Sequence, residues 1–359
     1  MAIDELSHIF SISEVSFVQV QQQLKNTDLF NLVWLADNTD NDAPTLKDIN
    51  DCQQVKLEMI AEQDLSAHSS SAKLVLFNDL NWQILFDFIK VCEANSINLN
   101  ICKLVKPSDE LDGAISFTLT DAITKQIQTE LNQWAEQHDV ELCYVENGPS
   151  IDKPGLLVMD MDSTAIQIEC IDEIAKLAGV GEQVAEVTAA AMRGELDFAE
   201  SLHARVATLT DAPVSIIDQV ADNLPLMPGL ENLVSQLQSY GWKLVIASGG
   251  FTYMTDVLKR QLNLDETVAN QLEMKNEKLT GKVLGRIVDA NVKAETVVEL
   301  AHKYNIDISQ TIAMGDGAND LVMMEAAQLG VAFHAKPLVR AQADVSVRTG
   351  GLDQLLYLL

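Results

Sequence analysis

The stretch Leu156-Leu157-Val158-Met159-Asp160-Met161-Asp162-Ser163-Thr164 runs from four apolar residues directly into two acids. A turn-forming Pro154-Gly155 pair precedes it, so the short apolar run predicts a strand that is buried on both faces. Because side chains alternate along a strand, Asp160 and Asp162 should emerge on the same side. Two such carboxylates repel each other, and either a divalent cation or one retained proton would relieve the repulsion. The stretch therefore predicts a metal site, an acid–base pair or, in the simplest case, an acidic loop.

Two other apolar runs are predicted strands that end in polar or glycine-rich segments. Thr311-Ile312-Ala313-Met314 leads into Gly315-Asp316-Gly317-Ala318-Asn319-Asp320, and Lys243-Leu244-Val245-Ile246-Ala247 leads into Ser248-Gly249-Gly250. The carboxyl ends of parallel strands share one edge of an open α/β sheet, where such sheets bind ligands. Glycine also lets backbone N–H groups approach an anion closely. Lys293 is a candidate charge partner at this edge, although an ordinary lysine at a helix start is the simpler interpretation.

In this order, D-x-D-x-T, S-G-G, K and G-D-G-x-N-D resemble the motifs of the haloacid dehalogenase-like phosphohydrolases. Further segments make the chain similar to the phosphoserine phosphatase family within that group. They are Glu169, Ile171-Asp172-Glu173-Ile174-Ala175, Met192-Arg193-Gly194, Phe198, Ser201-Leu202, Arg205-Val206 and Ser248-Gly249-Gly250-Phe251. The resemblance covers roughly residues 150 to 350, and no motif position there departs from the family pattern.

The resemblance implies a magnesium-dependent hydrolase that converts O-phospho-L-serine to L-serine and phosphate, the last step of serine biosynthesis. Asp160 would attack phosphorus and become an aspartyl-phosphate, and Asp162 would act as general acid and then general base. Mg²⁺ would be held by Asp160, the backbone carbonyl of Asp162, and Asp316, since hard oxygen ligands suit this ion. Asn319 and Asp320 would orient the groups around the metal.

Two sets of residues would hold the substrate if the resemblance extends to the binding site. The phosphoryl end would be bound by Ser248, the Gly249 N–H group, Lys293 and Asn319. Arg binds a carboxylate in a bidentate manner and Glu receives an ammonium group, so Arg205 and Glu169 would recognise the amino acid. From pattern alone, both are ordinary charges on a helix surface. Met192 and Phe198 would wall the substrate, or they would simply belong to the core of the cap.

The chain beyond about residue 150 is predicted to be a doubly wound parallel α/β sheet with a helical insertion. Strands alternate with helices over the core, 151–165 and 233–359. More than 75 residues separate Thr164 from Lys243, and the cap that they form, about 166–232, is mainly helical in its apolar spacing. Such an insertion is a candidate lid that excludes water from a reactive phosphoenzyme.

Residues 1–150 are predicted to form a separate α+β domain. Strands are expected at 73–77, 115–119 and 140–145, helices at 82–94 and about 121–138, and a solvated loop at 37–54. Relatives of phosphoserine phosphatase often carry ACT-like ligand-binding or dimerisation domains at this position. No glycine-rich ligand loop stands out here, so a structural or dimerising domain is favoured over a serine sensor; in the dimerising case the chain would form a homodimer through this domain.

Composition narrows the possible partners and the location. The net charge of −29 argues against a surface that neutralises nucleic-acid phosphates, but local cations can still bind a small anionic substrate. Five cysteines without a C-x-x-C pair are typical of a reducing compartment. Met1-Ala2-Ile3-Asp4-Glu5 does not resemble a signal peptide, and no apolar stretch reaches 18 residues. A cytoplasmic enzyme with no membrane or nucleic-acid partner is expected.

Three other functions share features with this prediction. A different small-phosphomonoester phosphatase or phosphotransferase would keep the core motifs and differ at Glu169 and Arg205. An ion-pumping ATPase also uses an aspartyl-phosphate, but it needs membrane spans that the sequence lacks. A serine-binding regulatory protein would have no need to keep four residues together, namely Asp160, Asp162, Lys293 and Asp316.

Overall fold

The structure is a computed structural model that describes residues 72–359, apart from the side chains at Trp82, Phe86 and 100–104. The predicted polar loop at 37–54 and the N-terminal segment lie outside the described residues. The chain divides into two compact units, one that ends at Gly148 and one that spans Pro149–Tyr357. No helix among residues 72–359 is long and apolar enough to cross a membrane.

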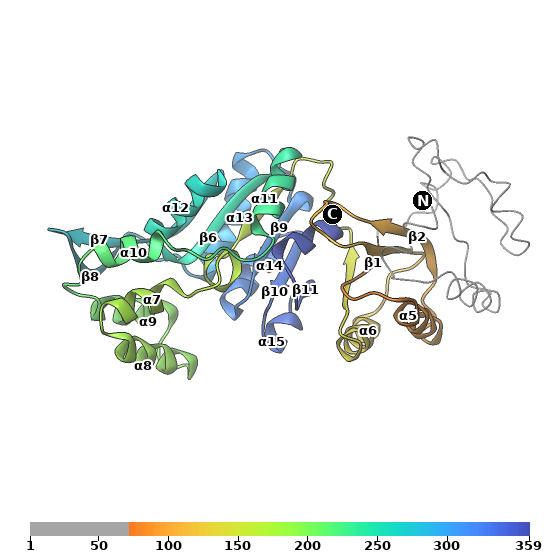
Figure 1. The fold of residues 1–359 in the computed structure, drawn as a ribbon, viewed down its shortest axis with the longest axis horizontal. Coiled ribbons are helices and arrows are strands. Elements are labelled where there is room, and N and C mark those ends of the chain that lie inside the picture. Colours follow the sequence, from red (N-terminus) through yellow and green to blue (C-terminus); the bar gives the residue numbers. More distant parts are fainter. Residues whose placement is uncertain (1–71) are drawn as a thin grey trace, which may run out of the picture. The chain divides into compact units, whose positions relative to one another are not determined.

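The described part of the first unit, residues 72–148, has the element order β-α-β-β-α-β (Figure 1). Its elements are β1 (Ala72–Phe77), α5 (Trp82–Ala94), β2 (Leu99–Val105), β3 (Ala114–Leu119), α6 (Lys125–Gln137) and β4 (Glu141–Glu146). The strands form an antiparallel sheet in the order β2-β3-β1-β4, the arrangement of a split βαβ fold. Strand β2 was not predicted from the sequence. Polar Asn100 and Lys103 interrupt its pattern, and its register with β3 shifts between Leu99 and Cys102.

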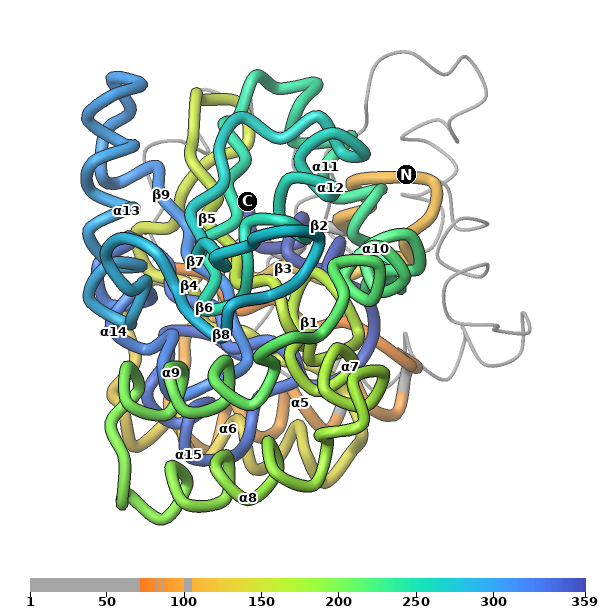
Figure 2. Tube along the Cα trace, turned by 90° about the vertical axis from the view of Figure 1, so that its left-hand side faces the viewer, coloured from red at the N-terminus to blue at the C-terminus, as the bar shows by residue number. Residues whose placement is uncertain are grey.

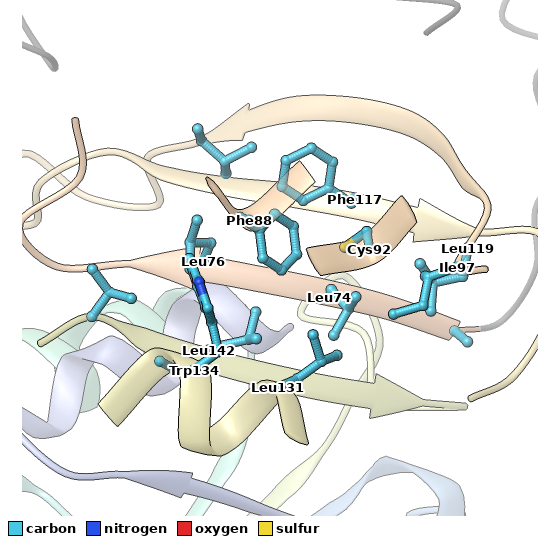
Figure 3. Close-up of a cluster of buried hydrophobic side chains, with 14 residues drawn as sticks. Leu74, Leu76, Phe88, Cys92, Ile97, Phe117, Leu119, Leu131, Trp134 and Leu142 are labelled. Carbon is cyan, nitrogen blue, oxygen red and sulfur yellow. The ribbon is translucent and has the colours of Figure 1, made fainter. Parts of the chain in front are cut away.

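The two helices within residues 72–148 contribute to one apolar core (Figure 3). Phe88 of α5 is fully buried, and its ring centroid lies 5.3 Å from that of Phe117 on β3 and 5.4 Å from that of Trp134 on α6. Leu74 and Leu76 of β1, which alternate along the strand, belong to the same core. Two amphipathic helices therefore cover one face of the sheet, which gives this segment its predicted α+β character.

The second unit contains the predicted parallel sheet, which is confirmed. Its strands are β5 (Leu156–Met159), β6 (Lys243–Phe251), β7 (Glu266–Lys275), β8 (Lys278–Leu284), β9 (Thr311–Gly315), β10 (Leu329–Phe333) and β11 (Val345–Val347). Their order is β11-β10-β9-β5-β6-β7-β8, and only the β7–β8 pair is antiparallel. Strand β5 is central and all four of its residues are buried, as its uninterrupted apolar sequence predicts.

Helices cover both faces of this sheet (Figure 2). They are α11 (Leu230–Ser239), α12 (Thr252–Leu262), α13 (Ala290–Lys303), α14 (Leu321–Ala326) and α15 (Pro337–Arg340). Figure 2 shows α13 and α14 on one face and α11 and α12 on the other. Val297 of α13 and Met323 of α14 pack with Val158 of β5 and Val245 of β6 in one buried cluster. The sheet is therefore doubly wound, and its carboxyl edge is left for a site.

The insertion after β5 is helical, as predicted. It contains α7 (Cys170–Leu177), α8 (Gly181–Met192), α9 (Phe198–Thr208) and α10 (Ser215–Ala221), which gather near β8 (Figure 1). The segment between α9 and α10 is tied to the β7–β8 hairpin by backbone hydrogen bonds. Asp211 N donates to Leu279 O at 2.9 Å, and Leu279 N donates to Ala212 O at 2.8 Å. The hairpin and the helical cap are therefore directly bonded to each other.

Candidate functional site

The chain leaves β5 through a strained turn that separates its two acids. Asp160 is 6% exposed, and its backbone N–H donates to Met314 O on β9 at 2.9 Å. Asp162 Oδ1 accepts a hydrogen bond from Cys170 N at 3.0 Å. Ser163 has a φ of 57°, and a non-glycine residue in this left-handed region costs roughly 1–2 kcal/mol. Its Oγ donates to Glu169 Oε1 at 2.7 Å, so the turn draws a cap carboxylate toward the strand end.

A buried ammonium group lies between two buried carboxylates at this edge. Lys293 Nζ, in the first turns of α13, is 2.7 Å from Asp160 Oδ1 and 2.7 Å from Asp320 Oδ1. The side chains of Lys293, Asp160 and Asp320 are 2%, 8% and 0% exposed. Burial alone would lower the pKa of Lys293, but the two carboxylates together raise it above its usual range. The lysine therefore stays charged and holds the ends of β5 and β9 together.

Asp316 completes a cluster of acids that suits a divalent cation. One oxygen each of Asp160, Asp316 and Asp320 lies within 4.8 Å of the others. Three carboxylates and the Lys293 ammonium leave two negative charges uncompensated. Burial and the neighbouring Asp320 raise the pKa of Asp160 well above its usual range, and the same two causes raise the pKa of Asp316 to about 6. Hard oxygen donors with this excess charge fit a divalent cation.

Asp320 was expected next to the metal, where it would orient the surrounding groups. In the structure one of its carboxylate oxygens is part of the three-acid cluster. Its Oδ2 accepts a hydrogen bond from Gly317 N at 3.0 Å, which fixes the loop after β9. Asn319 is exposed, and its Nδ2 donates to Asp320 Oδ1 at 3.3 Å.

Two glycines at the end of β6 allow close approach of neighbouring side chains. A Cβ on Gly249 would lie 2.8 Å from Phe198 Cζ, and a Cβ on Gly250 would lie 2.9 Å from Asp162 Oδ2. Ser248 is 1% exposed, and its Oγ accepts a hydrogen bond from Gly250 N at 2.9 Å. The structure therefore brings the β6 end, Asp162 and the cap residue Phe198 close together.

The cap contributes one partly buried cation to the site. Among the described residues, Arg205 Nε is buried without a hydrogen-bond partner. Burial lowers the pKa of the Arg205 guanidinium, while the carboxylates of Asp172, Glu169 and Asp162 act in the opposite direction. Glu169 is exposed. Asp172 lies in a segment that carried the family resemblance, but the sequence analysis gave it no role of its own.

Met192 and Phe198 have different surroundings. Met192 ends α8 and is 77% exposed, so the interpretation that it belongs to the core of the cap is wrong. Phe198 begins α9 and approaches Gly249 closely. The capping box of Asp197 and Glu200 fixes the start of that helix, with Glu200 N donating to Asp197 Oδ1 at 2.8 Å. The cap thus aims an aromatic ring at the β6 end.

The sequence analysis missed Asn270 on β7. Asn270 is 1% exposed and its side-chain amide bonds two backbone segments next to the site. A single asparagine in a strand of mixed polarity carries no sequence signal of such a role. The role of Asn270 becomes visible only in the folded structure, where β6 and β7 pair.

Comparisons with known proteins agree with this geometry. Residues 155–328 match the model of the haloacid dehalogenase-like hydrolase family. A curated phosphoserine phosphatase of Vibrio cholerae is 58% identical over 221 residues, which cover 62% of this chain and 67% of that protein. The crystal structure of a probable phosphoserine phosphatase from Vibrio cholerae, unliganded, has a TM-score of 0.68 and 46% identity, covering 80% of this chain and 86% of that one.

A third similarity concerns the reaction itself. A structure described as a phospho-aspartyl intermediate analogue of phosphoserine phosphatase has a TM-score of 0.55 and 37% identity. It covers 58% of this chain and 99% of that one, so the similarity is to the phosphatase unit alone. With an acid at the end of the central strand, a buried lysine and an inserted helical cap, the chain belongs to the phosphoserine phosphatase family of haloacid dehalogenase-like hydrolases.

Proposed function

We propose that this protein hydrolyses O-phospho-L-serine to L-serine and phosphate through an aspartyl-phosphate intermediate. The observation that carries the proposal is Arg205, a cap guanidinium whose buried Nε has no partner among residues 72–359. A buried donor without a partner is costly, and a substrate carboxylate would satisfy it. Arg205 also experiences the charge of Asp162, so this donor belongs to the same site as the acids.

Asp160 is the proposed nucleophile, because it stands at the end of the central strand and is held by Lys293. In the first step a carboxylate oxygen of Asp160 forms a bond to phosphorus and the bond to the serine oxygen breaks. Lys293 lowers the pKa of Asp160 against the opposing effects of burial and Asp320, which favours the ionised nucleophile, and it provides positive charge near the phosphoryl group. The Ser248 hydroxyl and the Gly249 N–H group are proposed to bind the phosphoryl oxygens, since preorganised donors stabilise charge that develops in the transition state.

Asp162 is the proposed general acid and base. Burial and the neighbouring Glu169 raise the pKa of Asp162 to about 6, so it can hold a proton close to neutral pH. It would give this proton to the departing serine oxygen. The carboxylate left behind would then take a proton from the water that attacks phosphorus, which releases phosphate and restores Asp160.

The carboxylate cluster is the proposed magnesium site. Asp160, Asp316 and the backbone carbonyl of Asp162 would hold the ion, with Asp320 and Asn319 orienting these groups. When bound, Mg²⁺ supplies positive charge to the phosphoryl oxygens. Removing the ion should therefore abolish turnover, and it should also weaken the fold around β5 and β9.

Recognition of the amino acid is assigned to the cap. Arg205 would bind the serine carboxylate, and Glu169, whose Oε1 already accepts from Ser163, would receive the ammonium group. Phe198 would form an apolar wall beside Gly249. Met192 is proposed to contact substrate only if its exposed side chain moves toward the site on binding, since it is 77% exposed in this structure.

Location and assembly are proposed from the buried cysteines and from the fold of the first unit. Cys92 and Cys170 are buried and form no disulfide among the described residues, which supports a reducing compartment such as the cytoplasm. The α+β unit at 72–148 is proposed to be an ACT-like domain that joins two copies of the chain, because its element order is that of a split βαβ fold.

A panel of small phosphomonoesters tests the proposed function. The purified protein is assayed with Mg²⁺ on phosphoserine, phosphothreonine, phosphoethanolamine, phosphoglycolate and p-nitrophenyl phosphate, and released phosphate is measured. We expect the highest kcat/KM on phosphoserine. If simple phosphomonoesters are hydrolysed as well as phosphoserine, the chain is another phosphatase of the same fold. If serine binds but no substrate is hydrolysed, the regulatory alternative holds.

A further inference from the structure

We propose that Asn270 is a positioning residue for phosphoryl transfer: it fixes the phosphate-binding end of β6 against the start of the helix that carries Lys293. The inference rests on the proposed function of Ser248, Gly249 and Lys293. Asn270 itself touches no reacting group, so it acts through the backbone that it holds.

The sheet is irregular at the segment that would bind phosphate. Between two paired positions, β6 advances four residues, from Ala247 to Phe251, while β7 advances two, from Val268 to Asn270. Strand β6 therefore carries two extra residues at its carboxyl end and bulges there. A bulge interrupts the regular ladder of hydrogen bonds and re-aims the backbone, so the bulged segment needs other bonds to hold it.

Asn270 supplies one of those bonds. Its Nδ2 donates to Gly249 O at 2.8 Å. The same peptide unit is held from its other side, because Gly250 N donates to Ser248 Oγ at 2.9 Å. With both its carbonyl and its N–H group bonded, the Gly249–Gly250 peptide has a fixed orientation. That orientation restricts the adjacent peptide, which carries the Gly249 N–H group.

The other end of the same amide reaches the segment before α13. Asn270 Oδ1 accepts a hydrogen bond from Val288 N at 2.8 Å. Val288 precedes Asp289, the N-cap of α13, whose Oδ1 accepts from Val292 N at 2.9 Å. Lys293 follows in the next position. One buried side chain thus links the β6 end to the helix that holds the buried lysine.

The residue type fits this double role. An amide has a donor on one atom and an acceptor on the other, which matches a carbonyl on one side and an N–H group on the other. Aspartate has the same shape but only accepts, so Asn270→Asp keeps the bond to Val288 and loses the donor to Gly249. Asn270→Leu keeps the approximate volume and loses both bonds.

Gln310 provides a matched control far from the carboxyl edge of the sheet. It is 7% exposed, precedes β9, accepts from Ser150 N at 2.9 Å and donates to Ser150 O at 2.9 Å. Gln310→Glu therefore removes one donor from a buried amide, as Asn270→Asp does. Gln310→Leu matches Asn270→Leu.

The experiment compares kinetics and stability of the four variants in the full chain. We measure kcat and KM on p-nitrophenyl phosphate and on phosphoserine, the inhibition constant of inorganic phosphate, and the urea midpoint. Asn270→Asp should weaken phosphate inhibition about tenfold and reduce kcat/KM by about 10- to 100-fold, equally on both substrates, because a small misplacement of donors is costly. The Gln310 variants should lose similar stability and stay within about twofold of wild-type kinetics.

Two results would overturn the inference. Kinetics of Asn270→Asp within about twofold of the wild type would reject a positioning role, and so would an equal loss of activity in Gln310→Glu. If Asn270→Leu does not fold, Asn270→Asp decides alone, and failure of both to fold would mean that Asn270 is needed for folding instead. If the wild type shows no preference for phosphoserine, the proposed function fails, while p-nitrophenyl phosphate and inorganic phosphate still test Asn270.

Discussion

Replacing Lys293 with methionine should leave two buried carboxylates facing each other without a counter-charge. The ammonium group lies 2.7 Å from oxygens of both Asp160 and Asp320, whose side chains are 8% and 0% exposed. Removing one partner of a buried ion pair costs about 3–5 kcal/mol. Methionine resembles the lysine stem in shape, so lost packing adds little. We expect the free energy of unfolding to fall by about 3–5 kcal/mol at pH 7 without divalent cations.

The loss in free energy of unfolding caused by Lys293→Met should shrink as the pH falls. Burial and Asp320 already raise the pKa of Asp160 in the intact protein, and loss of the ammonium group would raise it further. A carboxyl group whose pKa is higher in the folded than in the unfolded state binds more protons when folded. The free energy of unfolding is therefore highest, as far as this group is concerned, below its unfolded pKa. It falls as the pH rises through the folded pKa.

This effect is measured by urea unfolding of the full chain in EDTA. Unfolding is monitored by tryptophan fluorescence, to which Trp242 of the phosphatase unit, 2% exposed, contributes. Lys243→Met is the control. Lys243 Nζ lies 2.6 Å from Asp265 Oδ1, but these side chains are 38% and 21% exposed, so its loss should cost at most about 1 kcal/mol. Equal losses in the two variants would refute the argument. So would a Lys293→Met deficit that is the same at about pH 5 and about pH 8.

Two further predictions concern the acids after β5. Asp160→Asn should abolish turnover because an amide is a poor nucleophile, and trapping the wild type with beryllium fluoride should place the adduct on Asp160; an adduct on another residue would reject this assignment. Asp162→Asn should lose roughly two to four orders of magnitude in kcat on phosphoserine and less on p-nitrophenyl phosphate, whose leaving group needs little protonation. Equal losses on the two substrates would argue against Asp162 as the acid.

Much of the core could be predicted because its signals are local. Four apolar residues before Asp160 are enough to specify a strand buried on both faces, and the same pattern precedes Asp316. Parallel strands deliver their carboxyl ends to one edge, so the convergence of these acids follows from topology. The helical spacing of the cap likewise predicted α7 to α10.

The missed features depend on contacts between distant segments. Lys293 was expected near the phosphate, but its bonds to both Asp160 and Asp320 depend on how α13 packs against β5 and the loop after β9. Asn270 bonds Gly249 and Val288, 21 and 18 residues away in the chain. Neither relation leaves a periodic pattern in one sequence. Strand β2 was missed for another reason, because polar residues interrupt its alternation.

The proposed substrate specificity is tested most directly at Arg205, because the cap must distinguish phosphoserine from simpler phosphomonoesters. Phosphoethanolamine differs from phosphoserine only by lacking the carboxylate, so it makes every proposed contact except the one to Arg205. The measurement is kcat/KM of the wild type and of Arg205→Ala on these two substrates.

Losing a charge-assisted contact to a buried partner costs about 2–5 kcal/mol, which corresponds to roughly 30- to 5,000-fold in kcat/KM. We expect Arg205→Ala to lose this much on phosphoserine and to change little on phosphoethanolamine. An equal loss on both substrates would mean that Arg205 holds the cap together and would contradict recognition of the serine carboxylate by this residue.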